Sequence, residues 1–324
     1  MKAVILRGAL KEEHIKKIEE TAAKAKVDVC FLDSEKELPE DYEDAEIAYG
    51  FGMNIAKARK LRESKSLKWV NSTSAGIEML LKPGFFANED VLITNSAGAY
   101  GVSIAEHIIA VTLMMFRKID YHYAESLQGH WAEQLSQKSL KDCRITALGT
   151  GDIGRTFAKR VRAFEPESLI GVSRSGKCSE DVFDRVVPVE QLDEVLPQTE
   201  LLVMSLPGTR ETEGILSRER IALMPQGAYV VNVGRGSAVD EEALADALDG
   251  GKLAGAALDV FRYEPLPPKS RLWKTKGLLI TPHVAGNMTL EHTVDKNVEM
   301  FCENLLNYAE GRPLKHLVDR KTGY

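Results

Sequence analysis

The chain has 324 residues, of which 44% are hydrophobic and 28% charged, and its formal net charge is −6 at pH 7. This is the composition of a water-soluble globular protein, and the length predicts two domains. The negative charge argues against nucleic acid as a main partner, because phosphate binding needs a basic face. No stretch approaches the roughly 18 apolar residues of a membrane span, and the start "MKAVILRGALKEEH" lacks a small-residue cleavage site. We therefore expect a cytoplasmic protein that does not enter a membrane.

The first hundred residues alternate between short apolar runs and charged amphipathic segments. Strands are expected at 3–6, 28–32, 46–51, 67–72 and 91–94. Between the first two runs, Ile15, Ile18 and Ala22 share one face of a helical pattern. A long apolar helix, "SIAEHIIAVTLMMFRKI", is expected at 103–119.

A second series of strands and helices begins at "DCRITALGTGDIG". It continues through "LIGVSRSG", "LLVMSLPG", "AYVVNVGRGS", "LAGAALDVF" and "LLITPHVAG". A terminal helix follows, with Val294, Val298, Phe301 and Leu305 on one stripe. Strands that alternate with helices are typical of parallel α/β sheets, with domain boundaries expected near 97–102 and 286–290.

The four cysteines, Cys30, Cys143, Cys178 and Cys302, are widely scattered. No two have the spacing of a zinc site or a redox pair. We expect reduced thiols and no metal site.

A glycine-rich loop, Gly149-x-Gly151-x-x-Gly154, lies between an apolar strand pattern and a helix pattern. In this setting the first glycine allows a tight turn, the second lets the backbone approach a pyrophosphate, and the third lets helix and strand pack closely. The free N–H groups at the helix N-terminus would bind the anion. The loop therefore predicts a dinucleotide site.

The next strand ends at Ser173-Arg174-Ser175, and Ser173 stands 19 residues after Gly154. An Asp or Glu usually occupies this place and holds the ribose 2′-OH of NAD. Arg174 can instead pair with a 2′-phosphate, and both serines can donate hydrogen bonds to it, which favours NADP over NAD. Two other interpretations stay open: a polar turn without a ligand, and an Arg174 that stacks on the adenine and tolerates either cofactor.

Three later strand patterns are followed by Arg235, Glu264 and His283. Each has an ordinary explanation when taken alone: a surface ion pair, the end of a strand, or a structural histidine. Together with a nicotinamide they match the needs of 2-keto acid reduction. The substrate needs a cation for its carboxylate, a proton donor for the developing alkoxide, and a group that keeps this donor protonated.

The sequence resembles the D-isomer-specific 2-hydroxyacid dehydrogenases over nearly its whole length. The resemblance rests on "LGTGDIG", "SLPGTRETEGIL", "VNVGRGSAVDEEAL", "LDVFRYEPLP", "LWKTKGLLITPHVAG" and "EGRPLKHLVDRKTGY". It implies that His283 is the general acid and base, that Glu264 hydrogen-bonds to it and stabilises the imidazolium, and that Arg235 binds the substrate carboxylate.

The resemblance also implies residues around the cofactor. These are Gly149, Gly151, Asp152, Ile153 and Gly154 at the pyrophosphate, Leu206, Pro207 and Thr212 beside the adenosine, and Val233 and Asp259 at the nicotinamide. The Val233 carbonyl and the Asp259 carboxylate would accept hydrogen bonds from the nicotinamide amide.

For the substrate, the resemblance implies backbone amides at Ala75 and Gly76, with Phe51 as a pocket wall. Tyr100 would reach the nicotinamide or the substrate side chain, and Trp131 would either line a partner's pocket or seal a dimer.

The implied fold has two Rossmann-like or flavodoxin-like parallel-sheet domains with a cleft between them. Residues 1–98 and 287–324 would form the substrate domain, and 99–286 the NAD(P)-binding domain. A homodimer through 103–140 is implied, although packing within one chain would give the same apolar helix.

The leading hypothesis is an NADP-dependent reductase of small 2-keto acids such as glyoxylate and hydroxypyruvate, yielding D-hydroxy acids. The runner-up is a D-3-phosphoglycerate dehydrogenase, for which the basic run "KARKLR" at 57–62 is a candidate phosphate site and also a candidate solvated helix face. A non-catalytic dinucleotide sensor, like the corepressors that share these motifs, is the third.

Overall fold

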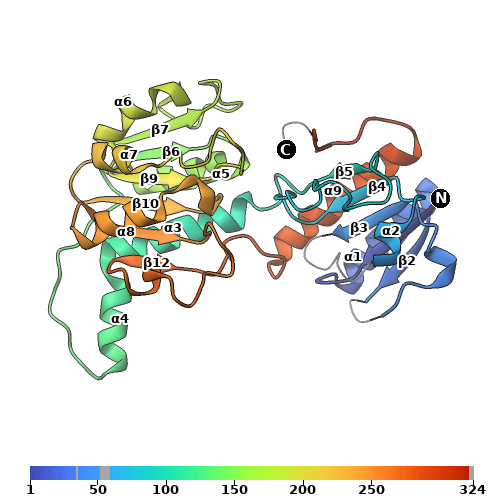
Figure 1. Ribbon diagram of the computed structural model, residues 1–324, viewed down its shortest axis with the longest axis horizontal. Coiled ribbons are helices and arrows are strands. Elements are labelled where there is room, and N and C mark those ends of the chain that lie inside the picture. Colours follow the sequence, from blue (N-terminus) through green and yellow to red (C-terminus); the bar gives the residue numbers. More distant parts are fainter. Residues whose placement is uncertain (34–35, 52–58, 321–324) are drawn as a thin grey trace. The chain divides into compact units, whose positions relative to one another are not determined.

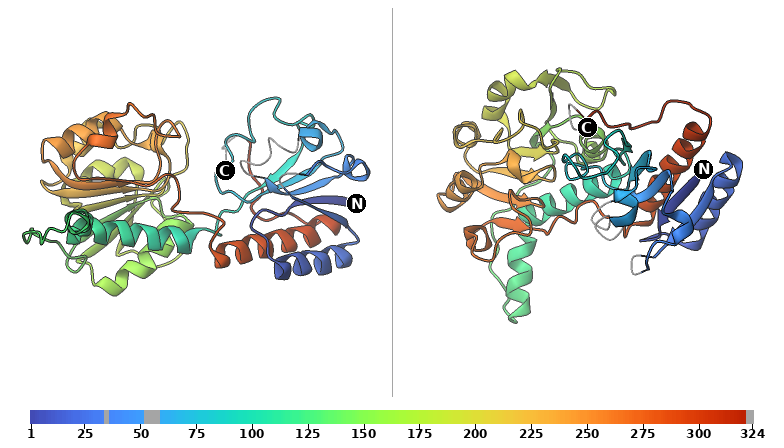
Figure 2. Two further views of the ribbon diagram at one scale, coloured as in Figure 1. Left: turned by 90° about the horizontal axis from the view of Figure 1, so that it is seen from below. Right: turned by 45° about the vertical axis from the view of Figure 1, so that its right-hand side comes forward.

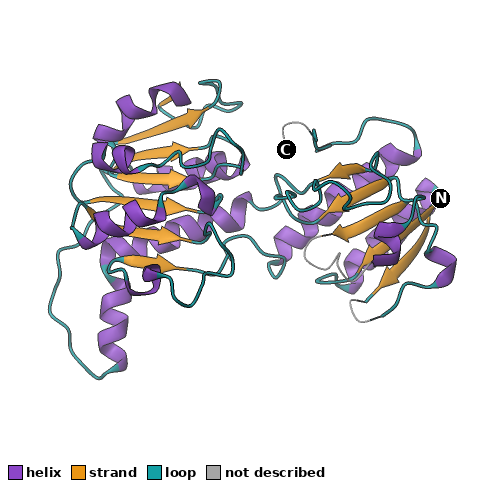
Figure 3. Cartoon of the chain, viewed as in Figure 1, coloured by secondary structure: helices purple, strands orange, loops and turns teal. Residues whose placement is uncertain are grey.

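The computed structural model describes residues 1–33, 36–51 and 59–320 and divides into two units. The discontinuous unit comprises Met1–Tyr100 and Asn287–Tyr324, and the central unit comprises Gly101–Gly286. Each is built on a single sheet with helices packed against it (Figures 1 and 3).

The discontinuous unit has a five-stranded sheet in the order β2-β1-β3-β4-β5, and every pairing is parallel. The strands are β1 (Lys2–Leu6), β2 (Asp28–Leu32), β3 (Ile47–Phe51), β4 (Trp69–Ser72) and β5 (Leu92–Thr94). The helices are α1 (Glu12–Ala25), α2 (Arg59–Glu63) and α9 (Glu291–Ala309). Helices α1 and α9 lie side by side on one face of this sheet (Figure 2).

Helix α9 belongs to this unit because its apolar stripe packs on the sheet. Trp69 of β4 is fully buried and stacks against Phe301 and Tyr308, at ring-centroid distances of 5.6 and 5.3 Å. The rest of the predicted stripe, Val294, Val298 and Leu305, is buried as well. The last helix of the chain thus completes a core that the first hundred residues begin.

The central unit has a seven-stranded parallel sheet in the order β12-β11-β10-β9-β6-β7-β8. The strands are β6 (Arg144–Leu148), β7 (Ser168–Ser173), β8 (Arg185–Pro188), β9 (Leu201–Met204), β10 (Ala228–Asn232), β11 (Leu253–Leu258) and β12 (Leu278–Ile280). The helices are α3 (Gly101–Arg117), α4 (Ile119–Leu127), α5 (Asp152–Val161), α6 (Leu192–Val195), α7 (Arg218–Leu223) and α8 (Glu241–Asp249).

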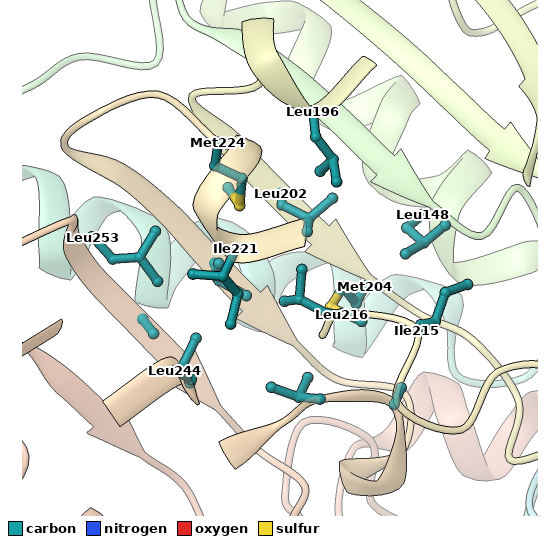
Figure 4. Close-up of a cluster of buried hydrophobic side chains, with 14 of the residues drawn as sticks. Leu148, Leu196, Leu202, Met204, Ile215, Leu216, Ile221, Met224, Leu244 and Leu253 are labelled. Atoms are coloured by element: carbon teal, nitrogen blue, oxygen red, sulfur yellow. The ribbon is translucent and has the colours of Figure 1, made fainter. Parts of the chain in front are cut away.

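Helices cover both faces of the central sheet, α3 and α5 on one and α6, α7 and α8 on the other (Figure 2). Leu202 and Met204 of β9 meet Leu216, Ile221 and other apolar side chains in a buried cluster (Figure 4). Covering on both faces explains why the inner strands are continuous apolar runs.

Strand order in the central sheet reverses direction at β6. The chain moves from β6 outward to β7 and β8, and then returns to add β9 on the other side. Ligands of open α/β sheets bind beyond the carboxyl ends of the strands at such a reversal. Both sheets are parallel with helices packed against them, which confirms the predicted fold class of two α/β domains.

The long helix expected at 103–119 is interrupted. Helix α3 ends at Arg117, Lys118 adopts a left-handed conformation with φ of 55°, and α4 then runs in a new direction. Helix α4 has no buried residue and projects from the unit (Figure 1), with Leu127 71% exposed. Across the described residues, no helix combines the length and apolar character that crossing a membrane requires.

Candidate functional site

Six neighbouring strands of the central sheet carry the predicted site residues just beyond their carboxyl ends. In sheet order these are Ser173–Ser175 at the end of β7, Gly149–Gly154 after β6, Leu206 and Pro207 after β9, Val233 and Arg235 after β10, Asp259 and Glu264 after β11, and His283 after β12. Because all six strands are parallel, these segments share one edge of the sheet.

The first and third glycines of the loop that joins β6 to α5 have almost no space around them. Gly149 has φ of 113°, a conformation that favours glycine, and its N–H donates to the Val172 carbonyl at 2.9 Å. A Cβ at Gly154 would lie 2.0 Å from the Gly149 carbonyl oxygen. The first and third glycines therefore let the helix begin directly under the strand end.

Gly151 differs from the other two, since a Cβ there would meet nothing within 4 Å. Gly151 is the exposed N-cap of α5 and, having no side chain, makes no capping hydrogen bond to the first amides of this helix. Asp152 and Ile153 follow it and are half-buried. Open space in front of uncapped helix amides fits the pyrophosphate of a dinucleotide.

Ser173 stabilises the loop after β7 by two hydrogen bonds to Lys177. The Ser173 hydroxyl donates to the Lys177 carbonyl at 3.0 Å and accepts from the Lys177 N–H at 3.1 Å. In this conformation its single hydrogen is used within the loop, so the hydrogen bond from Ser173 to a 2′-phosphate stays a prediction. Arg174 and Ser175 are exposed.

The loop after β9 carries Glu211, which lies within electrostatic reach of Arg174. Hydrogen bonds from Thr209 and from its own backbone lower the pKa of Glu211, and the charges of Arg174 and Arg210 lower it further. Thr212, which was predicted beside the adenosine, donates to the Pro207 carbonyl at 2.7 Å and accepts from the Thr209 N–H at 3.0 Å. Thr212 thus stabilises the loop after β9, which begins near Leu206 and Pro207.

The turn that carries Arg235 lies in close contact with the segments that follow β9 and β11 on either side. A Cβ at Gly234 would lie 2.6 Å from the Leu206 carbonyl oxygen, and one at Gly236 would lie 1.9 Å from the Phe261 carbonyl carbon. Arg235 is half-buried, and its Nη1 donates to the Gly234 carbonyl at 2.8 Å. Glycine on both sides therefore lets the backbone of Arg235 lie between the ends of β9 and β11.

Asn232, which was not among the predicted site residues, holds this turn through two hydrogen bonds. It is 1% exposed; its amide donates to the Arg235 carbonyl at 3.0 Å and its Oδ1 accepts from the Gly234 N–H at 3.1 Å. An asparagine at a strand end followed by Gly-x-Gly was the available signal.

His283 and Glu264 form a direct pair at the same edge. His283 Nδ1 and Glu264 Oε2 are 2.6 Å apart, and Glu264 Oε1 accepts from the Phe261 N–H at 2.8 Å. The backbone contact orients the carboxylate, and the carboxylate orients the ring. The two side chains are 49% and 34% exposed, so both are accessible from the solvent.

Asp259 holds the turn on which His283 stands. It is 2% exposed, and it accepts hydrogen bonds from the Thr281 hydroxyl at 2.6 Å and from the Val284 and Ala285 N–H groups at 2.9 Å each. Its own carbonyl accepts from the His283 N–H at 2.8 Å. The family resemblance implies that this carboxylate also binds the nicotinamide, and that role stays a prediction beside the observed structural one. Val233, the other residue predicted there, is buried.

The residues predicted to bind the substrate carboxylate lie in the discontinuous unit. Ala75 is exposed and Gly76 half-buried in the turn after β4, and the Ala75 carbonyl accepts from Asn95 Nδ2 at 3.1 Å. Tyr100 is only 8% exposed, and its hydroxyl donates to the Thr73 carbonyl of the same turn. In this conformation Tyr100 supports the turn from within the unit, and its contact with a substrate stays a prediction.

Phe51 ends β3, but its side chain lies outside the described residues. Trp131 is fully exposed in the segment after α4. Of the basic run 57–62, only its last four residues are described; there Arg59 pairs with Glu63 at 2.7 Å and Lys60 with Glu43 at 2.6 Å. These ion pairs agree with a solvated helix face.

A sequence model described as "D-isomer specific 2-hydroxyacid dehydrogenase, NAD binding domain" matches residues 109–285. The chain is 32% identical over 265 residues to glyoxylate/hydroxypyruvate reductase A of Salmonella newport (strain SL254), which covers 80% of this chain and 83% of that protein.

Solved structures are similar over almost the full length, and two serve as examples. A D-isomer specific 2-hydroxyacid dehydrogenase family protein from Aeromonas salmonicida has a TM-score of 0.84 and 30% identity, covering 98% of this chain and 99% of that one. A D-isomer specific 2-hydroxyacid dehydrogenase from Xanthobacter autotrophicus Py2, in complex with NADPH and MES, has a TM-score of 0.78 and 28% identity, covering 99% of both chains.

Proposed function

This chain belongs to the D-isomer specific 2-hydroxyacid dehydrogenase family, and from that premise we propose that it reduces small 2-keto acids of the glyoxylate and hydroxypyruvate class with NADPH. The observation that carries the proposal is the His283–Glu264 pair, at 2.6 Å, on the sheet edge that also holds the Arg235 turn and the glycine loop. The product is the D-2-hydroxy acid.

Reduction of the keto group consumes one hydride and one proton. A bound nicotinamide cofactor supplies the hydride. His283 is bonded to Glu264 through Nδ1, so Nε2 is the ring nitrogen that gives a proton to the carbonyl oxygen. Glu264 stabilises the imidazolium before transfer and fixes the ring orientation, while Arg235 binds the substrate carboxylate through a bidentate contact.

The cofactor assignment rests on the two loops nearest the reversal of strand order. The glycine loop and the N-terminus of α5 would hold the pyrophosphate, and Arg174 would hold the 2′-phosphate of NADP. The position of Arg174 supports this, because it is exposed at the carboxyl end of β7, next to β6 and its glycine loop in the sheet. The relative from Xanthobacter, which was solved with NADPH, supports the same choice.

The first test measures kcat/KM for glyoxylate and hydroxypyruvate with NADPH and with NADH. We expect turnover in the wild type, and His283→Ala should lower kcat by about 10²- to 10⁴-fold while NADPH binding is retained. His292→Ala, at an exposed histidine of α9 in the discontinuous unit, is the control and should behave as wild type. NADPH binding without any keto-acid turnover in the wild type would overturn the enzyme assignment and favour a dinucleotide sensor.

A second variant tests the cofactor preference separately. Arg174→Asp should lower the ratio of NADPH to NADH efficiency by about 10- to 100-fold, the equivalent of one lost charge-assisted contact. Arg185→Asp makes the same change of charge at the amino end of β8, away from the site, and should leave the ratio unaltered. Equal use of both cofactors by the wild type would remove the NADP assignment and leave the roles of Arg235, Glu264 and His283 untouched.

A further inference from the structure

We infer that Thr281 and His107 are positioning residues for His283 and act through the buried Asp259. The inference rests on the proposed function only in calling His283 the proton donor. The contacts themselves lie wholly in the central unit, and they join α3, the end of β11 and the end of β12.

The direction of each hydrogen bond follows from the chemistry of the groups. Asp259 Oδ1 lies 2.6 Å from Thr281 Oγ1, and an ionised carboxylate only accepts, so the hydroxyl donates its single hydrogen there. His107 Nε2 lies 3.3 Å from the same Thr281 oxygen. Since that oxygen has no second hydrogen, the Nε2–H of His107 is the donor in this contact.

His107 is suited to such a fixed role. It lies on α3, half-buried, and burial lowers its pKa against the opposing effect of Asp259. The ring is therefore neutral near pH 7, and the hydrogen on Nε2 defines a single tautomer. Donation from this ring completes the hydrogen bonding of the Thr281 hydroxyl.

The hydrogen bonds that run from His107 through Thr281 and Asp259 end at the turn that carries His283. His283 has φ of 54°, a left-handed backbone conformation that residues other than glycine rarely adopt. Asp259 holds this turn at the amides of Val284 and Ala285, and its carbonyl binds the His283 N–H. The Thr281 hydroxyl in turn fixes the rotamer of the carboxylate.

Any shift of the turn at His283 would weaken its contact with Glu264. A 2.6 Å hydrogen bond tolerates little displacement of the ring, so rotation of the Asp259 carboxylate would loosen it. Loss of the Thr281 hydroxyl should therefore change the ring tautomer of His283 and its rate of proton transfer, and not only the stability of the fold.

The test compares Thr281→Val with Thr281→Ser. The valine keeps the shape and removes the hydroxyl, and it should lower kcat for keto-acid reduction about tenfold, the effect expected of a displacement of less than 1 Å. The serine keeps the hydroxyl and should restore most of the rate. Thr146→Val is the matched control, because Thr146 is a buried threonine of the same unit whose hydroxyl lies 2.7 Å from that of Thr199, away from the site.

The ¹⁵N shifts of the histidine ring nitrogens give a readout that does not require activity. When the ring is neutral, the wild type should show His283 as the Nδ1–H tautomer, which donates to Glu264, and the valine variant should show a mixture of both tautomers. His107→Leu should shift the population in the same direction by a smaller amount, and His107→Gln, which retains an N–H donor, should restore it.

An unchanged tautomer and an unchanged kcat in Thr281→Val would overturn the inference. So would a loss of kcat that Thr281→Ser fails to restore, or one that Thr146→Val reproduces at an equal loss of Tm. A wild type without turnover would refute the proposed function alone, since the ring shifts would still decide whether Thr281 and His107 position His283.

Discussion

The second and third glycines of the loop after β6 have different surroundings, so alanine substitutions at the two positions should affect different properties of the protein. At Gly154 a Cβ would lie 2.0 Å from the Gly149 carbonyl oxygen, whereas ordinary contact begins at 3.4 Å. At Gly151 a Cβ would meet nothing within 4 Å. We expect Gly154→Ala to lower stability, and Gly151→Ala to lower cofactor affinity at nearly constant stability.

For Gly154→Ala, α5 or the strand end must move by more than 1 Å to relieve the contact. Overpacking of this kind costs about 3 kcal/mol at its upper range, and better helix propensity returns roughly 0.5–1 kcal/mol. The net loss of about 2 kcal/mol corresponds to a decrease in Tm of roughly 4–8 °C for a unit of this size.

For Gly151→Ala, two small effects oppose each other. Alanine is a poorer N-cap than glycine by some tenths of a kcal/mol, and it reduces the entropy of the unfolded chain by about 0.4–1 kcal/mol. Tm should therefore change by less than about 2 °C. The added methyl projects into the space that the pyrophosphate needs, so the Kd for NADPH should rise at least tenfold, about 1.4 kcal/mol.

Thermal unfolding and fluorescence titration with NADPH measure the two effects on the same samples. A Gly151→Ala variant that binds NADPH as tightly as the wild type would contradict the first expectation, because the open space at the N-terminus of α5 would then not receive the cofactor. A Gly154→Ala variant with the wild-type Tm would contradict the second, since the close approach to Gly149 would then have no energetic cost.

Three further predictions concern the core, the acid response and the exposed arm. Trp69→Ala removes the ring that stacks on Phe301 and should lower the free energy of unfolding by about 3–5 kcal/mol, measured by urea denaturation; a loss below 1 kcal/mol would contradict the packing of α9 on β4. The pKa of His107 is lowered in the folded protein, so the unfolded chain takes up a proton at a higher pH than the folded one, and the free energy of unfolding should decrease as the pH falls below about 6.5. His107→Gln should flatten the pH dependence of this free energy between pH 7.5 and 5.5, and an unchanged slope would contradict the assignment. Trp131→Glu, on the fully exposed segment after α4, should shift a predicted homodimer toward monomer in sedimentation velocity, and an identical profile would locate the interface elsewhere.

Local patterns were enough to predict the two-domain α/β architecture and much of the arrangement at the sheet edge. Alternating apolar runs indicated parallel strands, and the stripe from Val294 to Leu305 indicated the packed face of α9. Because side chains that follow parallel strands meet at one edge, Arg235, Glu264 and His283 could be placed together without coordinates. These inferences depend on periodicity and chain order, which the sequence contains directly.

Other features depended on contacts between distant segments. The break at Lys118 leaves no signal in an apolar helical pattern. The buried position of Tyr100, the clamp of Asp259 on the His283 turn, and the contact from His107 to Thr281 each join residues far apart in the chain. A single side chain can serve a ligand or its own fold, and only the tertiary structure decides which partners it meets, because hydrogen bonding depends on distances that no spacing along the chain specifies.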